Sequence, residues 1–281
     1  MTNETNESSG ELIAARFPDQ TEAIAPLPDG GGLLHSMLSR GSCRAFQPEP
    51  VEPEVLHVLC AAALASPTKS DLQQRDIIIL RDPAQRAALA ELVSGQTWVS
   101  EAPGLLVFCG NNRRQRLLHE WSGTAFANDH LDALFNAAAD AAIALGAFVT
   151  AAEALGLGCC PISAVRNEAQ RVSELLDLPQ HVFPFAGLAV GYPARKPDIS
   201  MRLPLGATCH VDRYQEGDLP TAVSHYDRKR SERQPYAKQR DVETFGTSDS
   251  YGWSQDKIRQ YAKPERADFG DFVRSKGFRL D

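Results

Sequence analysis

Ser39-Arg40-Gly41-Ser42-Cys43-Arg44-Ala45-Phe46 is the most informative stretch of the sequence. Arg40, Ser42 and Arg44 alternate, so in an extended segment their side chains leave the backbone on the same side. Two guanidinium groups and a hydroxyl on one face suit a phosphate or a planar ring rich in carbonyl groups. The pattern predicts a binding site for a nucleotide-like cofactor.

Polar residues in later segments add to this site. Thr68 and Gln73 lie in a Ser/Thr-rich turn, and Gln96 follows some twenty residues later. A glutamine offers a carbonyl and an amide to the donor–acceptor edge of a pyrimidine-like ring. Arg202, close to Ser200, adds donors for a phosphate. Taken alone, the Arg-x-Ser-x-Arg cluster is more typical of solvated surface residues, and only the other polar segments favour a cofactor site.

Composition limits the class of protein. The chain has 281 residues, of which 43% are hydrophobic and 23% charged, as expected of a soluble globular chain with a sizeable core. A net charge of −7 argues against nucleic-acid binding. We expect no membrane span, no secretory signal and hence a cytoplasmic protein. Six scattered cysteines indicate reduced thiols and no metal site.

Several familiar motifs are absent or incomplete. Asp268-Phe269-Gly270 spells a kinase tripeptide, but no Gly-rich loop or catalytic-loop motif accompanies it. Gly156-Leu157-Gly158 lacks the third glycine of a dinucleotide-binding fingerprint. There is no His-Glu-x-x-His motif and no Gly-x-Ser-x-Gly elbow. These observations exclude the commonest kinase, dehydrogenase, metalloprotease and serine hydrolase interpretations.

Apolar periodicity predicts alternating helices and strands between residues 53 and 191. We expect helices over 53–65, 83–93, 131–155 and 168–176, and strands over 77–80, 104–109, 158–162 and 185–191. The helix over 131–155 is rich in alanine and apolar on most of its circumference, so it must be buried. It either pairs with its copy across a dimer two-fold axis or forms the central core helix of a monomer.

Both ends of the chain differ from its middle. Residues 1–30 are expected to form a flexible N-terminal arm and residues 31–210 a domain. Residues 211–281 hold about half of the Lys and Arg and few aliphatic residues, but carry spaced aromatic residues. This composition is typical of an arm that wraps around another surface.

The ordered set of segments resembles the nitroreductase-like FMN flavoproteins, in particular their NADPH-preferring, oxygen-insensitive nitroreductase and flavin reductase group. The resemblance runs from about Leu33 to Pro204 through 39–46, 61–73, 94–109, 151–158, 165–167, 178–182, 191–193 and 202–204. It implies an α+β three-layer fold with a mixed central sheet flanked by helices. It also implies an intertwined homodimer in which residues 211–281 form an extended arm around the partner.

The resemblance further implies non-covalent FMN at the dimer interface. Arg40, Ser42 and Arg202 correspond to phosphate ligands, and Arg44 to a cation beside the N1/O2 edge of the ring. Thr68, Gln73 and Gln96 correspond to groups that bind the ring and ribityl chain, and 161–164 to the stretch near N5. The complete set is Arg40, Gly41, Ser42, Cys43, Arg44, Thr68, Gln73, Gln96, Pro161, Ile162, Ser163, Ala164, Arg166, Ser200 and Arg202.

This chain departs from the family pattern at several of these positions. Gly41 and Ser200 stand where basic residues are usual, and Ser163 and Ala164 replace glycines. Pro161 removes a backbone donor. We expect FMN binding to survive these changes. The same departures favour the alternative from another class, a non-enzymatic flavin-binding or redox-sensing protein.

The activity implied is hydride transfer from NADPH through flavin N5 to a small planar acceptor, a nitroaromatic, quinone or flavin, by a ping-pong mechanism. The flavin carries this chemistry, so no side chain is named as catalytic. Arg233, Lys238 and Arg240 in the tail either bind the 2′-phosphate of NADPH or form a solvated charged surface. Rival activities on the same scaffold are flavin reductase, azo, chromate or quinone reductase, and dehalogenase.

Overall fold

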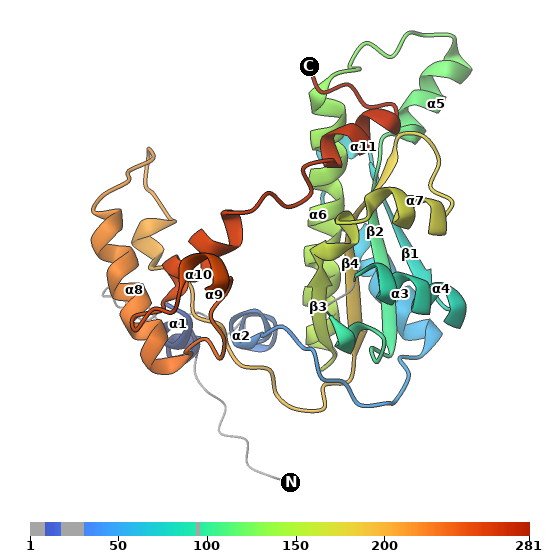
Figure 1. Cartoon of the computed structure of the whole chain (residues 1–281). Helices are drawn as coiled ribbons and strands as arrows, with labels where there is room; N and C mark the ends of the chain where they lie inside the picture. The colour runs from blue at the N-terminus through green and yellow to red at the C-terminus, as the bar shows by residue number, and fades with distance from the viewer. Residues whose placement is uncertain (1–8, 18–30, 94–95) are drawn as a thin grey trace. The chain divides into compact units, whose positions relative to one another are not determined.

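The computed structural model describes residues 9–17, 31–93 and 96–281, which form two compact units (Figure 1). The sheet unit comprises Gly41–Pro197 and Arg266–Asp281, and the helical unit comprises Met1–Arg40 and Asp198–Glu265. This division differs from the expected boundary at residues 210 and 211. The chain leaves the sheet unit at Pro197 and returns to it at Arg266.

The sheet has four strands, β1 (Arg75–Leu80), β2 (Gly104–Asn111), β3 (Gly158–Ile162) and β4 (Val182–Gly191), in the order β1-β2-β4-β3. All three pairings are antiparallel. The α+β class is confirmed, but the expectation of a mixed sheet is wrong for the described residues. All eight residues of the central strand β2 are buried, which explains its continuous apolar sequence.

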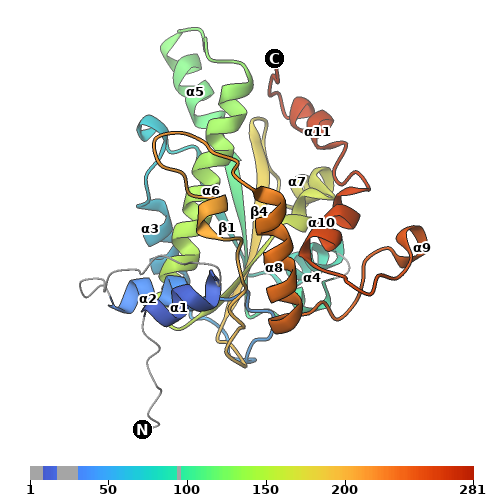
Figure 2. The same cartoon turned by 90° about the vertical axis from the view of Figure 1, so that its left-hand side faces the viewer.

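Helices cover both faces of the sheet, as Figure 2 shows. Leu106 and Phe108 of β2 point to one face and pack with α3 (Pro53–Leu64) and α6 (Leu131–Ala154). Leu105 and Val107 point to the other face and pack with α4 (Pro83–Leu92) and α7 (Ala169–Leu175). Because alternate residues of a strand face opposite sides, one strand supports two cores, and the three-layer arrangement is confirmed.

The last residues of the chain belong to the sheet unit. Helix α11 (Phe269–Ser275) places Phe272 in a cluster with Phe183 of β4, and the ring of Phe278 lies 5.5 Å from Phe183. The buried ammonium of Lys276 donates to the Leu178 carbonyl at 2.6 Å. The unit is completed by α5 (Arg113–Ser122) and the 3₁₀ turns η1 (Lys69–Asp71), η2 (Thr97–Val99) and η3 (Ser163–Arg166).

The helical unit contains α1 (Ser9–Arg16), α2 (Gly31–Ser39), α8 (Leu219–Arg233), α9 (Val242–Phe245), α10 (Trp253–Tyr261) and the turn η4 (Leu205–Ala207). Residues 9–16 were expected in a flexible arm but form a helix that packs on α2. The remainder of that arm, residues 1–8 and 18–30, lies outside the described residues. Helices α8 and α10 meet through Tyr226 and Trp253, whose rings are 5.5 Å apart.

Helix α6, with 24 residues, is long and apolar enough to cross a membrane by length and composition, contrary to our expectation that no such run exists. Its inner face is nevertheless the core of the sheet unit, where Ala144 and Phe148 are fully buried. This supports the interpretation of a central core helix. Its outer face is also apolar, with Phe135 66% and Ile143 42% exposed.

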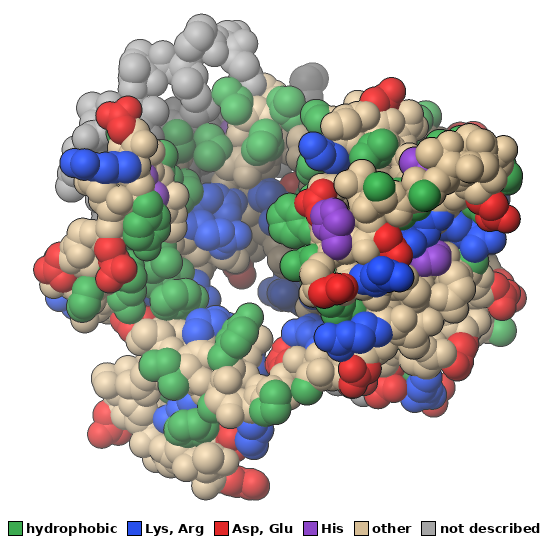
Figure 3. All heavy atoms as spheres, turned by 90° about the horizontal axis from the view of Figure 1, so that it is seen from above, with side chains coloured by type: hydrophobic (Ala, Val, Ile, Leu, Met, Phe, Trp, Pro, Cys, Tyr) green, Lys and Arg blue, Asp and Glu red, His purple; other side chains and the backbone are tan. Residues whose placement is uncertain are grey.

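Charged side chains of both signs are interspersed with hydrophobic ones over the face of the sheet unit seen in Figure 3. This mixture accords with the modest negative net charge of the chain.

Candidate functional site

Residues 41–44 place two of the predicted ligands on one side of the backbone. Ser42 and Arg44 are exposed, whereas Gly41 and Cys43 are buried. The N–H of Cys43 donates to the Cys159 carbonyl at 3.0 Å, so this segment lies alongside β3. A Cβ atom on Gly158 would come within 2.6 Å of the Cys43 sulfur, so the contact requires glycine there.

The guanidinium of Arg44 also approaches a third predicted segment. It lies 6.0 Å from the ring centroid of Trp98, within cation–π distance. Trp98 belongs to η2, which Gln96 directly precedes, and Gln96 is half-buried. The structure therefore brings together the segments that contain Arg44, Gln96 and the start of β3.

The stretch expected near flavin N5 presents few side chains. Pro161 and Ser163 are exposed, but Ile162 and Ala164 are buried in the core. Arg166 donates to the Phe185 carbonyl and its guanidinium lies 5.7 Å from the Phe185 ring. Burial, and then the nearby Arg266, lower the pKa of Arg166. Its side chain holds η3 against β4, so this stretch offers a ligand mainly its backbone, Pro161 and Ser163.

The turn that carries Thr68 and Gln73 has an uncommon backbone. Ser70, Asp71 and Gln73 adopt left-handed conformations with φ of 48°, 58° and 51°. Non-glycine residues rarely occupy this region, and where they do the surrounding structure must hold them there. The N–H of Gln73 donates to Thr68 Oγ1 at 3.2 Å.

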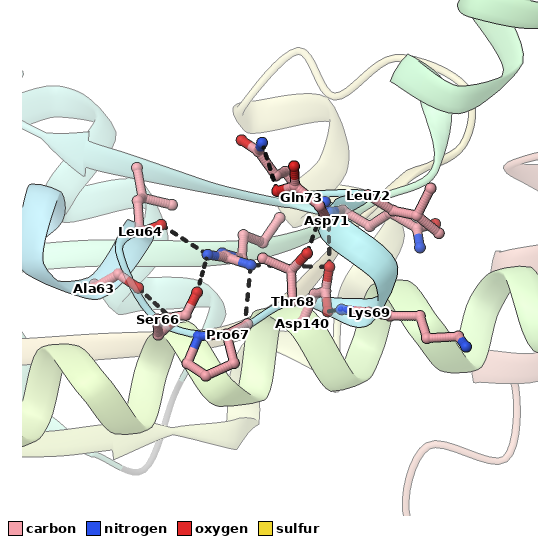
Figure 4. A network of polar contacts seen from close by, with 12 residues as sticks. Ala63, Leu64, Ser66, Pro67, Thr68, Lys69, Asp71, Leu72, Gln73 and Asp140 are labelled. Carbon is pink, nitrogen blue, oxygen red and sulfur yellow. Dashed lines mark hydrogen bonds and ion pairs between the residues drawn. The ribbon is translucent and has the colours of Figure 1, made fainter.

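A buried ion pair between Asp140 and Arg75 supports this turn, and Figure 4 shows Asp140 beside Lys69 of the turn. Asp140 of α6 accepts from the N–H groups of Lys69 and Gln74, each at 2.9 Å. Arg75 lies 3.9 Å from Asp140 and donates to the Leu64 and Ser66 carbonyls, each at 2.8 Å. Neither residue belongs to the predicted set, although Asp140 is an acid within an Ala-rich apolar helix, where a charge needs a partner.

The Thr68–Gln73 turn and Arg44 lie at opposite ends of the sheet. The turn leads into Arg75, which pairs with Gly110, whereas Cys159 pairs with Val190 and Val190 with Gly104. The two ends are thus separated by the length of β2, about 20 Å at ~3.3 Å per residue. One chain does not bring these predicted ligands together.

Arg40, Ser200 and Arg202 belong to the helical unit, where the buried side chain of Arg16 connects them. Arg16 donates to the Arg40 carbonyl at 2.6 Å and the Ser200 carbonyl at 3.3 Å. The backbone N–H of Arg202 donates to the Arg16 carbonyl at 2.8 Å. Arg16 had no place in our predicted set because it lies outside the segments that carry the resemblance.

A cavity of about 680 Å³ in the helical unit is rich in cations and aromatic rings. None of the described residues that line it is acidic, although the lining residue Lys257 forms an ion pair with Asp256 at 2.7 Å. They are Arg16, Phe17, Ser200, Met201, Arg202, Leu203, Leu205, Thr208, Tyr226, Arg230, Tyr236, Trp253 and Lys257. Such a lining suits an anion that also has an apolar part.

The three tail cations predicted for NADPH differ in their surroundings. Arg233 and Lys238 are exposed. Arg240 instead donates to the buried Asp256 at 3.0 Å. Burial alone would raise the pKa of Asp256, but hydrogen bonds from Lys257, Tyr251 and Arg240 outweigh it, so its pKa lies below the usual value. Arg240 therefore has a structural partner.

Comparisons with known proteins agree with this structure. The family models for "Nitroreductase family" and "Nitroreductase family, C-terminal domain" match residues 37–192 and 200–281. A Bacillus subtilis "FMN reductase [NAD(P)H]" is 32% identical over 254 residues, 89% of this chain and 98% of the relative. A Salmonella typhimurium "Oxygen-insensitive NADPH nitroreductase" is 37% identical over 191 residues, 68% of this chain and 78% of the relative.

Solved structures show the same fold. The Vibrio harveyi NADPH:FMN oxidoreductase complexed with NAD⁺ has a TM-score of 0.76 and 28% identity, with 88% of this chain and 98% of that chain covered. The family models together span the sheet and most of the helical unit. The chain therefore belongs to the nitroreductase family.

Proposed function

We propose that the protein is an FMN-dependent oxidoreductase that takes electrons from NADPH and passes them to a small planar acceptor. Its relatives carry the names of FMN reductases and nitroreductases. The observation that carries the proposal is the exposed pair Ser42 and Arg44, held beside β3 and Trp98. In its specific form, the proposal is that a nitroaromatic, a quinone or a flavin accepts the electrons by a ping-pong mechanism.

The residues present fit FMN chemically. Arg44 offers a fixed cation to the ring edge on which negative charge collects, which stabilises that charge. Ser42, Arg40 and Arg202 supply donors for the phosphate. The buried position of Gly41 accounts for the lack of a second basic side chain there. Bound FMN supplies the hydride-transfer chemistry, and the protein's residues bind and orient it and set its charge environment.

We further propose that the protein acts as a homodimer. The outer face of α6 exposes Phe135, and α3 exposes Val58 at 62%. Exposed apolar surface of this kind is typical of an interface. In a two-fold dimer, the Thr68–Gln73 turn of one copy can complete the site around Arg44 of the other. The helical unit, which holds most of residues 211–281, is then the arm that contacts the partner.

We propose that two of the three tail cations, rather than all three, bind the 2′-phosphate of NADPH. Arg240 is engaged by Asp256, so Arg233 and Lys238 are the better candidates. No disulfide joins any two of the described cysteines, which favours a reducing compartment such as the cytoplasm.

The visible spectrum of the purified protein tests the cofactor and the reaction together. We expect flavin bands near ~450 nm that bleach with anaerobic NADPH and return when a nitroaromatic or quinone is added. A protein that neither retains nor rebinds FMN contradicts the proposal. Bound flavin that NADPH does not reduce supports a flavin-binding protein without this activity.

Mixed dimers test the shared site. Arg44→Ala and Gln73→Ala homodimers should each bind FMN weakly at both sites. If each site combines Arg44 of one copy with Gln73 of the other, a mixed dimer regains one intact site, and half the flavin should bind tightly. A mixed dimer with no tight site places both residues in the same copy's site and contradicts the arrangement.

A further inference from the structure

The N-terminal segment before residue 37 lies outside both family models. The match with the Bacillus subtilis relative covers 98% of that protein but only 89% of this chain. Helix α1, over Ser9–Arg16, lies within this additional segment. Helix α1 therefore lies outside the regions that the two family models match.

Arg16, the last residue of α1, contacts the end of α2. Its Nε and Nη2 donate to the Leu38 carbonyl at 3.0 and 2.7 Å, and Nη2 also donates to the Arg40 carbonyl at 2.6 Å. The final carbonyls of a helix lack partners within the helix, and a cation there is stabilised by the helix dipole. Arg16 thus fixes the direction in which the chain leaves α2 at Arg40.

The same guanidinium holds a second, distant segment. Its Nη1 donates to the Ser200 carbonyl at 3.3 Å, and the Arg16 carbonyl accepts from the N–H of Arg202 at 2.8 Å. The Arg16 residue is only 6% exposed. One buried side chain therefore sets the backbone positions of Arg40 and of the Ser200–Arg202 segment within the helical unit.

The surroundings of Arg16 are chemically suited to an anion. Arg16 lines the 680 Å³ cavity together with Arg202, Arg230 and Lys257. The Nε of Arg230 is buried without a hydrogen-bond partner among the described residues. A buried donor without a partner is costly unless an acceptor completes it, and of the four cations Lys257 already has Asp256 as an ion-pair partner at 2.7 Å.

We propose that Arg16 is a positioning residue for the flavin phosphate, supplied by a helix that lies outside the regions matched by the family models. This inference rests on the proposed function, in which Arg40 and Arg202 bind the phosphate. Arg16 acts through them: it fixes their backbones before the ligand arrives, so less conformational freedom is lost on binding. Its own positive charge adds to the attraction for the anion.

Comparison of FMN with riboflavin, which has no phosphate, tests this role. The full-length chain, freed of flavin, is titrated with each ligand as the wild type and as Arg16→Gln and Arg16→Lys. We expect Arg16→Gln to weaken FMN binding about tenfold or more, as loss of a positioning partner typically does, and to leave riboflavin binding unchanged. Arg16→Lys should restore part of the FMN affinity, since an ammonium keeps the charge but not the fork of donors.

Arg228→Gln, which removes an exposed cation from α8, is the matched control and should leave both affinities unchanged. If Arg16→Gln lowers the affinities for FMN and riboflavin equally, or changes neither, the positioning role is overturned. If the wild type binds neither flavin, the proposed function fails instead. Thermal unfolding of each variant shows whether a change in affinity accompanies a loss of folded protein.

Discussion

The sheet unit and the helical unit are held together by different kinds of buried side chain. The sheet unit buries continuous apolar clusters on both faces of β2, with Phe108 and Phe148 in edge-to-face contact at 5.7 Å. The helical unit buries Arg16, Asp256 and Arg259 among its aromatic residues. The first unit is stabilised by the removal of apolar surface from water, and the second depends on the partners of its buried charges.

Arg259 illustrates how the helical unit is organised. Its guanidinium donates to the Arg240 and Gly246 carbonyls, each at 2.9 Å, and lies 5.0 Å from the Tyr251 ring. A chain with few aliphatic residues can thus hold a defined fold when cations join loops to aromatic rings. This segment is therefore folded despite its polar composition.

The largest loss of folding stability should follow from a cavity created in the core of the sheet unit. Phe148→Ala removes a fully buried ring from α6, and we expect the free energy of unfolding to fall by about 3–5 kcal/mol. Urea unfolding followed by far-UV circular dichroism measures this change. Leu118→Ala on α5, where the side chain is 52% exposed, is the control and should have little effect. Equal losses in both variants would contradict the assignment of the core to α6.

Helices and strands were predicted well from the sequence where buried residues recur at the regular spacing of the element. The strand over 158–162 was predicted with its observed bounds, and the helix over 131–155 to within one residue at its end. Both have apolar patterns that arise from packing on the sheet. Helix α5 was missed because its sequence, Arg113–Ser122, is mainly polar and none of its residues is buried.

The candidate site was less accessible to prediction. The residues that carry the family resemblance could be named, but their supports, Asp140, Arg75 and Arg16, act through distant backbone groups. Asp140 and Lys69 are 71 positions apart, and Arg16 and Ser200 are 184 apart. No local pattern indicates such partners. Asp140, an acid in the middle of an apolar helix, was the one signal available.

The helical unit should be the more sensitive to acid. Asp256→Asn removes the charge that Lys257, Tyr251 and Arg240 stabilise, and we expect a loss of about 2 kcal/mol at neutral pH. The folded pKa of Asp256 is lowered, so its contribution is present above the unfolded pKa of about 3.9 and is lost as the pH falls through the folded value.

Amide hydrogen exchange in α10, measured from neutral to acid pH, reports the loss of stability in the helix that contains Asp256. The wild type should lose protection in acid, whereas Asp256→Asn should be weakly protected throughout and change less with pH. Asp249→Asn alters an exposed carboxylate of the same unit and should behave as the wild type. If Asp256→Asn retains the full acid response, other carboxylates determine it and the buried network is not the main support.

The smallest expected effect concerns the end of the chain in the sheet unit. Gly277 has φ of +84°, and a Cβ atom there would lie 2.6 Å from Nε2 of His181. Gly123 has a similar φ of +66° with no atom within 4 Å of its Cβ position, so Gly123→Ala adds backbone strain alone. We expect each alanine to cost about 1–2 kcal/mol through strain, and Gly277→Ala also to displace the His181 ring.

The titration of His181 distinguishes displacement of its ring from backbone strain alone. Burial, followed by the charge of Arg116, lowers the pKa of His181, and the hydrogen bond with Gly277 opposes this. Because burial is the larger influence, displacement of the ring by Gly277→Ala should raise the pKa toward its ordinary value. Gly123→Ala should leave it unchanged, as NMR of the imidazole protons would show. If the pKa of His181 is unaltered in Gly277→Ala, the last residues of the chain adjust around the new methyl group. The backbone near Gly277 then tolerates a local shift, although it belongs to the apolar sheet unit.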